Sequence, residues 1–261
     1  MAKLYFNYGV MGSSKSANAL MTHFNYQERG QKPLMVKPRR DTRDSEKVVS
    51  SRIGLRCPCI YFDELQGYTD QQIKVYDSII VDEVQFLSES DVDFLVHIVD
   101  DLDVPVVCYG LRTDFKGELF TGSKRLFEMA DRINEVKTVC WCGRKAIMNA
   151  RFDNSGKVLK DGEQIQIGAN ECYTGLCRKH WREGNLGVKH YRSESETIRE
   201  VILNMPSYFN LSDLYYILKE EYDITNRLNI RRIVDELCES EVIEYEPINN
   251  DEWAFKVVTG G

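Results

Sequence analysis

The N-terminal segment places the tightest limit on how this chain can fold. Residues 3–8 alternate and are rich in β-formers, a turn of small residues follows over residues 9–16 (GVMGSSKS), and helical periodicity continues to about residue 28. In such a strand–turn–helix unit, successive backbone N–H groups can turn inward around a phosphate. We therefore expect a phosphate-binding loop made of Gly9, Val10, Met11, Gly12, Ser13, Ser14, Lys15 and Ser16.

Two side chains of this loop have the chemistry for ATP, and a third departs from the usual pattern. Lys15 would supply a positive charge to the β- and γ-phosphates, and the Ser16 hydroxyl would ligate Mg²⁺. Ser14 stands where glycine is typical, so it is strained if that position needs a φ that glycine alone adopts easily. By itself the segment could also be an ordinary turn beside a surface lysine.

The residues up to about 133 alternate strands with helices. Apolar runs at 32–38, 78–81 and 104–109 indicate buried strands, and residues 90–101 have amphipathic helical periodicity. This alternation predicts an α/β fold with a parallel sheet of the P-loop NTPase kind. We place this α/β domain at residues 1–133.

The apolar run at 78–81 ends in two carboxylates, Asp82 and Glu83. An aspartate at the tip of a buried strand beside a phosphate loop is where a carboxylate holds Mg²⁺. Strand alternation would point Glu83 to the opposite side, where it could act as a general base for a substrate hydroxyl. The alternative is a strand end followed by a solvated helix N-terminus, but the pair and the loop support each other.

Cysteine and histidine form a second constellation. The chain has eight cysteines and no secretory signal, so we expect reduced thiols. Three thiolates and one imidazole would make a closed tetrahedral set, typical of structural Zn²⁺; they are Cys140, Cys142, Cys177 and His180. Cys172 is a competing ligand, and unliganded core thiols are the alternative. The pair Cys57 and Cys59 has no second pair at metal spacing, so we interpret it as structural.

Short strands and turns surround these cysteines. Strands are expected at residues 136–141 and 150–152, which predicts a small zinc-ribbon-like β subdomain at residues 134–190. No apolar run approaches the ~20 residues that span a bilayer. The N-terminus lacks the cationic and apolar regions of a signal peptide, so a cytoplasmic protein is expected.

The net charge of −7 belongs to the C-terminal part of the chain. Residues 193–261 hold 15 acidic and 6 basic residues, a balance of −9, which leaves 28 basic and 26 acidic residues, a balance of +2, for residues 1–192. Helices expected at 196–204, 212–222 and 225–240, followed by strands at 242–245 and 253–258, predict a winged-helix-like module at residues 195–261.

Such a module usually suggests DNA binding. The third helix does carry Arg227, Arg231 and Arg232, but the acidic balance has the wrong sign for neutralising phosphates. We therefore favour a protein partner or support of an oligomer over nucleic acid, with a stabilising appendage as the remaining alternative.

Several motifs together resemble the type II thymidine kinases, over roughly residues 1–183. They are GVMGSSKS at 9–16, Asp41-Thr42-Arg43, SRIG at 51–54, DEVQF at 82–86, YGLRTDF at 109–115, Ile167-Gly168, Tyr173 and CRKH at 177–180. The resemblance implies transfer of the ATP γ-phosphate to the 5′-hydroxyl of thymidine, with deoxyuridine as a further acceptor.

The resemblance also implies roles for individual residues. Glu83 would be the catalytic base, and Asp82 and Ser16 would serve Mg²⁺. Asp41, Arg43 and Gln85 would belong to the nucleotide site. Met11, Leu111 and Phe115 would wall the nucleoside, and a lasso loop pinned by zinc would grip the base through Gln164, Ile165, Gln166, Ile167, Gly168 and Tyr173. A homotetramer and inhibition by thymidine triphosphate are further implications.

Two other classes of function compete with a nucleoside kinase. One is a catalytically weak nucleotide sensor that acts through its C-terminal module, which Ser14 and that module would support. The other is a P-loop ATPase of another kind, which leaves the motif at 109–115 unexplained. Thymidine-stimulated release of ADP separates the kinase from both.

Overall fold

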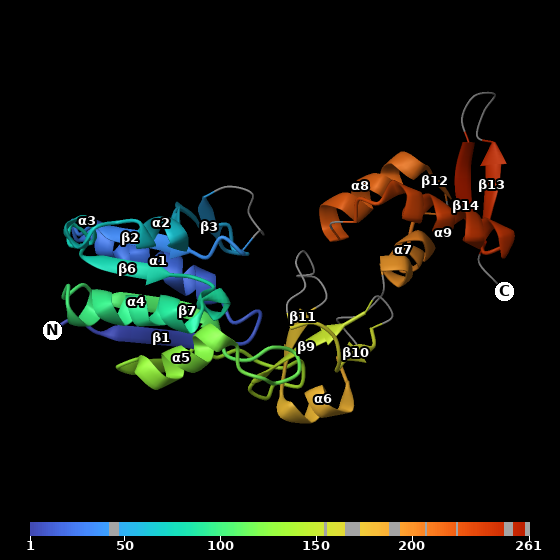
Figure 1. The fold of residues 1–261 in the computed structure, drawn as a ribbon. Helices are drawn as coiled ribbons and strands as arrows, with labels where there is room; N and C mark the ends of the chain where they lie inside the picture. The colour runs from blue at the N-terminus through green and yellow to red at the C-terminus, as the bar shows by residue number, and fades with distance from the viewer. Residues whose placement is uncertain are drawn as a thin grey trace. The chain divides into compact units, whose positions relative to one another are not determined.

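The computed structural model describes residues 1–41, 47–153, 156–164, 173–187, 194–206, 208–222, 224–247 and 253–258. The chain separates into two compact units, residues 1–153 with 157–187, and residues 188–261 with 154–156. Figure 1 shows the elements in chain order. Across these described ranges, no helix is both long enough and apolar enough to cross a membrane.

The first unit is built on a six-stranded parallel sheet, which confirms the predicted α/β fold. The strand order is β5-β2-β6-β7-β1-β8. The strands are β1 (Leu4–Gly9), β2 (Pro33–Lys37), β5 (Ile60–Tyr61), β6 (Ser78–Val81), β7 (Val106–Leu111) and β8 (Arg132–Glu135). Each paired neighbour in this sheet runs parallel.

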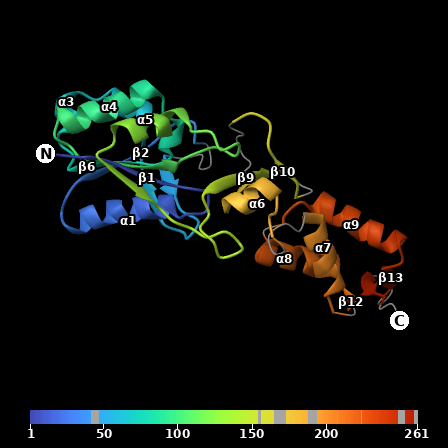
Figure 2. The same ribbon diagram turned by 90° about the horizontal axis from the view of Figure 1, so that it is seen from below.

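Helices cover both faces of the sheet because its strands alternate their buried side chains. Met35 and Ile80 pack on one face against Leu20 of α1 (Lys15–Glu28). Their strand neighbours, such as Val81, pack on the other face against Leu95 of α4 (Glu89–Asp100). The second face is also covered by α2 (Phe62–Gln66), α3 (Asp70–Ile73) and α5 (Thr121–Met129). Figure 2 shows α1 on one side and α3, α4 and α5 on the other.

The first unit also contains two small antiparallel sheets. The β10-β9-β11 sheet comprises β9 (Met148–Phe152), β10 (Val158–Leu159) and β11 (Tyr173–Leu176), and α6 (Arg178–Glu183) follows. A separate hairpin joins β3 (Val48–Ser50) to β4 (Arg56–Pro58). The strand expected at 150–152 is therefore confirmed as the end of β9.

The strand expected at residues 136–141 was wrong. The chain is extended earlier, in β8, which pairs with β1 in the main sheet. Residues 139–145 instead form a tight knuckle, in which the Cys140 N–H donates to the Arg144 carbonyl at 2.7 Å and Gly143 has a φ of 80°. The β-forming residues at 136–141 predicted a strand, but the chain turns at residues 141–144, where Gly143 adopts a positive φ that glycine tolerates easily.

The second unit has its own apolar core. Its elements are α7 (Glu194–Leu203), β12 (Tyr208–Phe209), α8 (Leu211–Tyr222), α9 (Arg227–Glu239), β13 (Ile243–Pro247) and β14 (Trp253–Val257). Ile202, Leu214 and Ile233 bring the three helices into this core. The expected helices and hairpin are present, and the sequence missed β12, whose two residues pair with β14.

Candidate active site

The loop at residues 9–16 connects β1 to α1, as the sequence predicted. The chain is close-packed at its entry, because a Cβ on Gly9 would lie 2.4 Å from the Ser13 Oγ and 2.7 Å from the Val136 carbonyl. Ser13 donates its N–H to the Val10 carbonyl at 3.3 Å. Lys15 begins α1 and is buried, and its Nζ donates to the same Val10 carbonyl at 2.8 Å. The ammonium group is thus held over the loop that is expected to cradle phosphate.

Ser14 occupies the backbone conformation that glycine would favour. Its φ and ψ are 61° and 28°, in the left-handed region. A residue with a Cβ pays about 1 kcal/mol or more for this conformation. The serine that stands where glycine is typical therefore costs backbone conformational energy at this position.

Ser14→Gly is expected to raise the free energy of unfolding by about 1 kcal/mol and to retain turnover, because it relieves the left-handed strain. Chemical denaturation of the full chain measures this difference. Ser13→Gly is the matched control, since Ser13 is not among the residues with positive φ and has no such strain to relieve. A Ser14→Gly protein less stable than wild type would contradict the assignment of strain.

The two carboxylates follow β6 directly. Asp82 and Glu83 are both buried, and the Asp82 N–H donates to the Val36 carbonyl of β2 at 3.0 Å. Glu83 has a φ of 56° and a ψ of 38°, so the strand has ended and a turn, not strand alternation, aims its side chain. Left-handed non-glycine residues cluster at functional sites, where the surrounding structure sustains their strain.

Gln85 fixes the Glu83 carboxylate. Its Nε2 donates to Glu83 Oε2, and its Oε1 accepts the Leu111 N–H at 3.0 Å. Gly110 leaves room for this contact, because a Cβ there would lie 2.8 Å from the Gln85 Oε1. The Gln85 amide therefore connects the acidic turn to the segment after β7.

Asp41 lies at the end of the segment that follows β2. Its carboxylate is 3.9 Å from the Nζ of Lys37, and both side chains are buried. The Lys37 Nζ also donates to the Val48 carbonyl at 2.9 Å. Sequence reasoning missed Lys37, which looks like an ordinary strand-end lysine. Arg43 lies outside the described residues.

The residues predicted to wall the nucleoside come from three segments. Leu111 and Met11 are half-buried, whereas Phe115 is almost fully buried, with the Arg151 guanidinium 5.1 Å from its ring centroid. The Gln164 Nε2 donates to Asp114 Oδ2 at 3.0 Å. Tyr173 begins β11, opposite Arg151. The other four lasso residues, 165–168, lie outside the described residues, as does Cys172.

The four predicted metal ligands come together. The ligand atoms of Cys140, Cys142, Cys177 and His180 all lie within 4.8 Å of one another. The Cys140 Sγ is 3.4 Å from His180 Nδ1, and the Cys142 Sγ is 3.9 Å from the Cys177 Sγ. A tetrahedral Zn²⁺ would space such atoms by about 3.5 to 3.8 Å, so the cluster fits that ion.

Local contacts shape the metal cluster further. A backbone hydrogen bond at Arg144 lowers the pKa of the Cys142 thiol, which favours the thiolate, whereas burial raises the pKa of Cys140. The Trp141 ring stacks on the His180 imidazole at 4.2 Å. Trp181 follows His180 in α6, and its Nε1 donates to the Phe115 carbonyl at 3.0 Å. The cluster is therefore connected to the proposed nucleoside wall.

The comparisons with known proteins agree with this geometry. A profile described as "Thymidine kinase" matches residues 2–181. The chain belongs to the thymidine kinase family. Thymidine kinase from Zymomonas mobilis is 48% identical over 188 residues, covering 70% of this chain and 97% of that protein. Thymidine kinase from Escherichia coli K12 is 46% identical over 190 residues, with 70% and 92% covered.

The family match covers most of the first unit and ends before residues 188–261, which make up nearly all of the second unit. It does not favour the nucleotide-sensor alternative. A solved replication initiation factor aligns with 91% of this chain and 55% of its own, at 13% identity and a TM-score of 0.33, which is too low to support an argument.

Proposed function

We propose that this chain transfers the γ-phosphate of ATP to the 5′-hydroxyl of thymidine, with deoxyuridine as a further acceptor. One observation carries the proposal: the phosphate loop, the Asp82-Glu83 turn and the segment from Leu111 follow β1, β6 and β7, which are neighbours in the parallel sheet. The carboxyl ends of parallel strands meet at one edge, where such folds bind their ligands. ATP and thymidine would meet there.

Glu83 is our candidate for the general base. As the 5′-oxygen attacks the γ-phosphorus, the bond from phosphorus to the β,γ-bridging oxygen breaks and ADP leaves. The hydroxyl proton passes to Glu83, whose position is fixed by Gln85. Lys15 would exchange its contact with the Val10 carbonyl for the β- and γ-phosphates. Phosphoryl transfer needs this positioning and charge neutralisation more than covalent help.

Asp82 and Ser16 are the residues that would hold Mg²⁺. A carboxylate and a hydroxyl suit this hard cation, which when bound neutralises charge on the phosphate oxygens. Asp41, with Arg43, would assist at the phosphates or the sugar. For Zn²⁺ we propose a structural role, with three thiolates and one imidazole leaving no position for water.

Asp82→Asn is expected to raise the Mg²⁺ concentration needed for half-maximal rate and to lower kcat/KM by about 100-fold, because the amide loses the negative charge. A Mg²⁺ titration of the initial rate measures both. Asp77→Asn is the matched control, since Asp77 precedes the same strand and its exposed carboxylate accepts the Lys32 N–H. An unchanged Mg²⁺ requirement in Asp82→Asn would remove Asp82 from the metal site.

The activity itself is tested with the purified protein, ATP, Mg²⁺ and thymidine. We expect thymidine monophosphate, with ADP release that depends on thymidine. ADP release that ignores thymidine would instead favour an ATPase, and failure of folded, zinc-loaded protein to form product would favour the nucleotide sensor.

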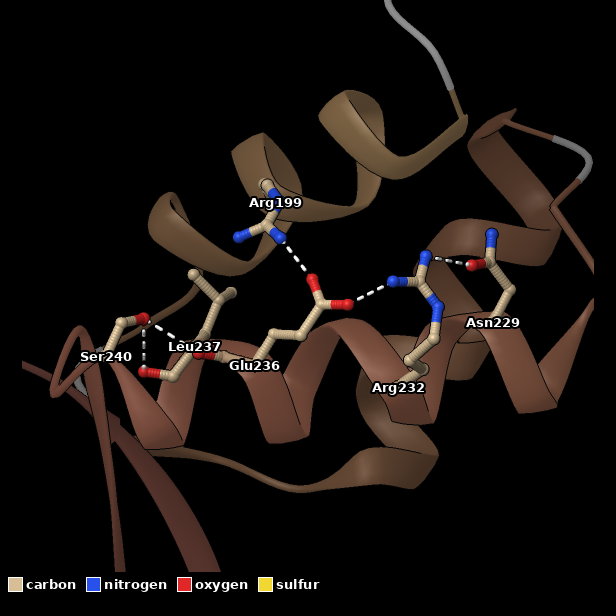
Figure 3. Close-up of polar contacts among 6 residues, drawn as sticks. All are labelled: Arg199, Asn229, Arg232, Glu236, Leu237 and Ser240. Atoms are coloured by element: carbon tan, nitrogen blue, oxygen red, sulfur yellow. Dashed lines mark hydrogen bonds and ion pairs between the residues drawn. The ribbon is translucent and has the colours of Figure 1, made fainter.

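We also propose three domains along the chain: a kinase domain at residues 1–133, a zinc-binding lasso subdomain at 134–190 and, in the second unit, a winged-helix-like module at 195–261. Its order of helix, strand, two helices and hairpin supports this proposal. A protein contact is favoured over nucleic acid because acidic partners hold two of the three arginines of α9, while the third, Arg227, lies over the Tyr215 ring. Arg231 pairs with Asp235 at 3.0 Å, and Glu236 joins Arg232 to Arg199 (Figure 3).

The assembly and its regulation are proposed from the family resemblance. They include a homotetramer, inhibition by thymidine triphosphate and a cytoplasmic location. Sedimentation of the full chain and inhibition assays test the first two.

A further inference from the structure

One rung of the β9–β11 ladder lies directly on the phosphate loop. Asn149 of β9 and Gly175 of β11 are register partners in this antiparallel pair. Asn149 is 2% exposed, and Gly175 faces Val10 and Met11. Both strands belong to the small sheet that precedes the metal ligand Cys177, so this rung joins that sheet to the loop between β1 and α1.

Both polar atoms of the Asn149 amide have backbone partners from different segments. Its Oδ1 accepts the Met11 N–H at 2.8 Å, and its Nδ2 donates to the Thr113 carbonyl at 2.6 Å. Met11 belongs to the phosphate loop, and Thr113 lies between Leu111 and Phe115 in the segment proposed to wall the nucleoside. One buried amide therefore bridges the nucleotide and nucleoside sides of the site.

The contact at Gly175 makes this bridge possible. A Cβ at this position would lie 2.9 Å from the Val10 Cγ2 and 3.1 Å from the Met11 carbonyl. A side chain would push β11 away from the loop. Because β9 is paired with β11, Asn149 would move with it and its bond to Met11 would lengthen. Gly175 thus permits the close approach of the small sheet to the phosphate loop, and this approach brings Asn149 within hydrogen-bond distance of the Met11 N–H.

We propose that Asn149 is a positioning residue that orients the first half of the phosphate loop for ATP and ties it to the 111–115 segment. The Met11 N–H is committed to Asn149, so phosphate binding is left to the N–H groups later in the loop. Because this peptide is held in one orientation, the loop is pre-organised and spends less binding free energy on ordering itself. The inference rests on the proposed ATP site.

The decisive variant is Asn149→Leu, which puts an apolar side chain with the same number of heavy atoms in place of the amide and removes both hydrogen bonds. We expect the Kd for ATP, measured by calorimetry without thymidine, to rise about tenfold, equivalent to about 1.4 kcal/mol. The KM for ATP should rise by a similar factor, while kcat changes by less than about threefold, because Asp82 and Glu83 lie in the turn after β6 and neither bonds to Asn149 through the two contacts that the variant removes. Hydrogen exchange at the Met11 amide should be faster in the variant.

Met148→Ala is the matched control. Met148 neighbours Asn149 in β9, so its side chain points to the opposite face of the strand. It should destabilise the sheet without changing the Kd for ATP or the exchange of the Met11 amide. Because ATP binding is measured without the nucleoside, loss of thymidine phosphorylation alone would not count against Asn149.

The proposal is overturned if Asn149→Leu binds ATP within about twofold of wild type, or if its only effect is the lower stability seen in Met148→Ala. Should Asn149→Leu not fold, Asn149→Ala is the second variant. Hydrogen exchange in the wild-type protein then gives an independent test. A Met11 amide that exchanged as fast as solvent-exposed amides would exclude its hydrogen bond to Asn149, on which the proposal depends.

Discussion

Glu83→Gln is expected to form thymidine monophosphate about 1,000-fold more slowly than wild type, while its affinity for ATP changes little. The substitution keeps the size of the side chain and a carbonyl oxygen that can accept from Gln85, so the turn after β6 should survive. What it removes is the basic carboxylate that takes the proton of the attacking hydroxyl. Single-turnover formation of product with saturating ATP measures the chemical step directly.

Glu89→Gln provides the matched control for this prediction. Glu89 is an exposed carboxylate in the first turn of α4, six positions further along the chain, and has no assigned part in the reaction. Its substitution should leave the rate unchanged. If Glu83→Gln retained more than about a tenth of the wild-type rate with normal ATP binding, a different group would have to accept the proton.

The features that the sequence predicted well are those encoded by neighbouring residues. A buried strand, a turn of small residues and a helix define the phosphate loop locally, and β1 and α1 begin and end within a few residues of the expected positions. The cluster of Cys140, Cys142, Cys177 and His180 was also predictable, because two short Cys/Cys and Cys/His pairs have the spacing of metal ligands. The loop residues, and the two members of each Cys or Cys/His pair, lie close along the chain, although the two pairs are themselves 35 positions apart between Cys142 and Cys177.

Contacts between distant residues were harder to predict. Asn149 meets Met11 across 138 positions, and an asparagine inside a short strand gives no sign of such a partner. The left-handed conformation of Glu83 was hidden for a similar reason, since only the surrounding fold makes a non-glycine residue adopt it. β12 was missed because two residues are too few to show alternation, and its partner β14 lies far along the chain.

The second large effect is expected from the metal cluster. Cys177→Ser should lower the affinity for Zn²⁺ by at least about 100-fold and reduce thymidine binding more strongly than ATP binding. Cys177 joins β11 to α6, and α6 carries both His180 and Trp181, whose Nε1 donates to the Phe115 carbonyl. Loss of the ion would loosen Cys177 and α6, and with them the contact from Trp181 to the Phe115 carbonyl on the nucleoside side of the site.

Zinc content by elemental analysis, together with separate titrations of thymidine and ATP, measures these effects on the same preparation. Cys57→Ser is the matched control, because Cys57 is a half-buried thiol in the same unit that lies near His23 and outside the metal cluster. It should keep the ion and both affinities. A Cys177→Ser protein that retained full zinc and bound thymidine normally would show that the metal does not organise the nucleoside site. Equal losses of ATP and thymidine binding would mean instead that the ion supports the whole first unit.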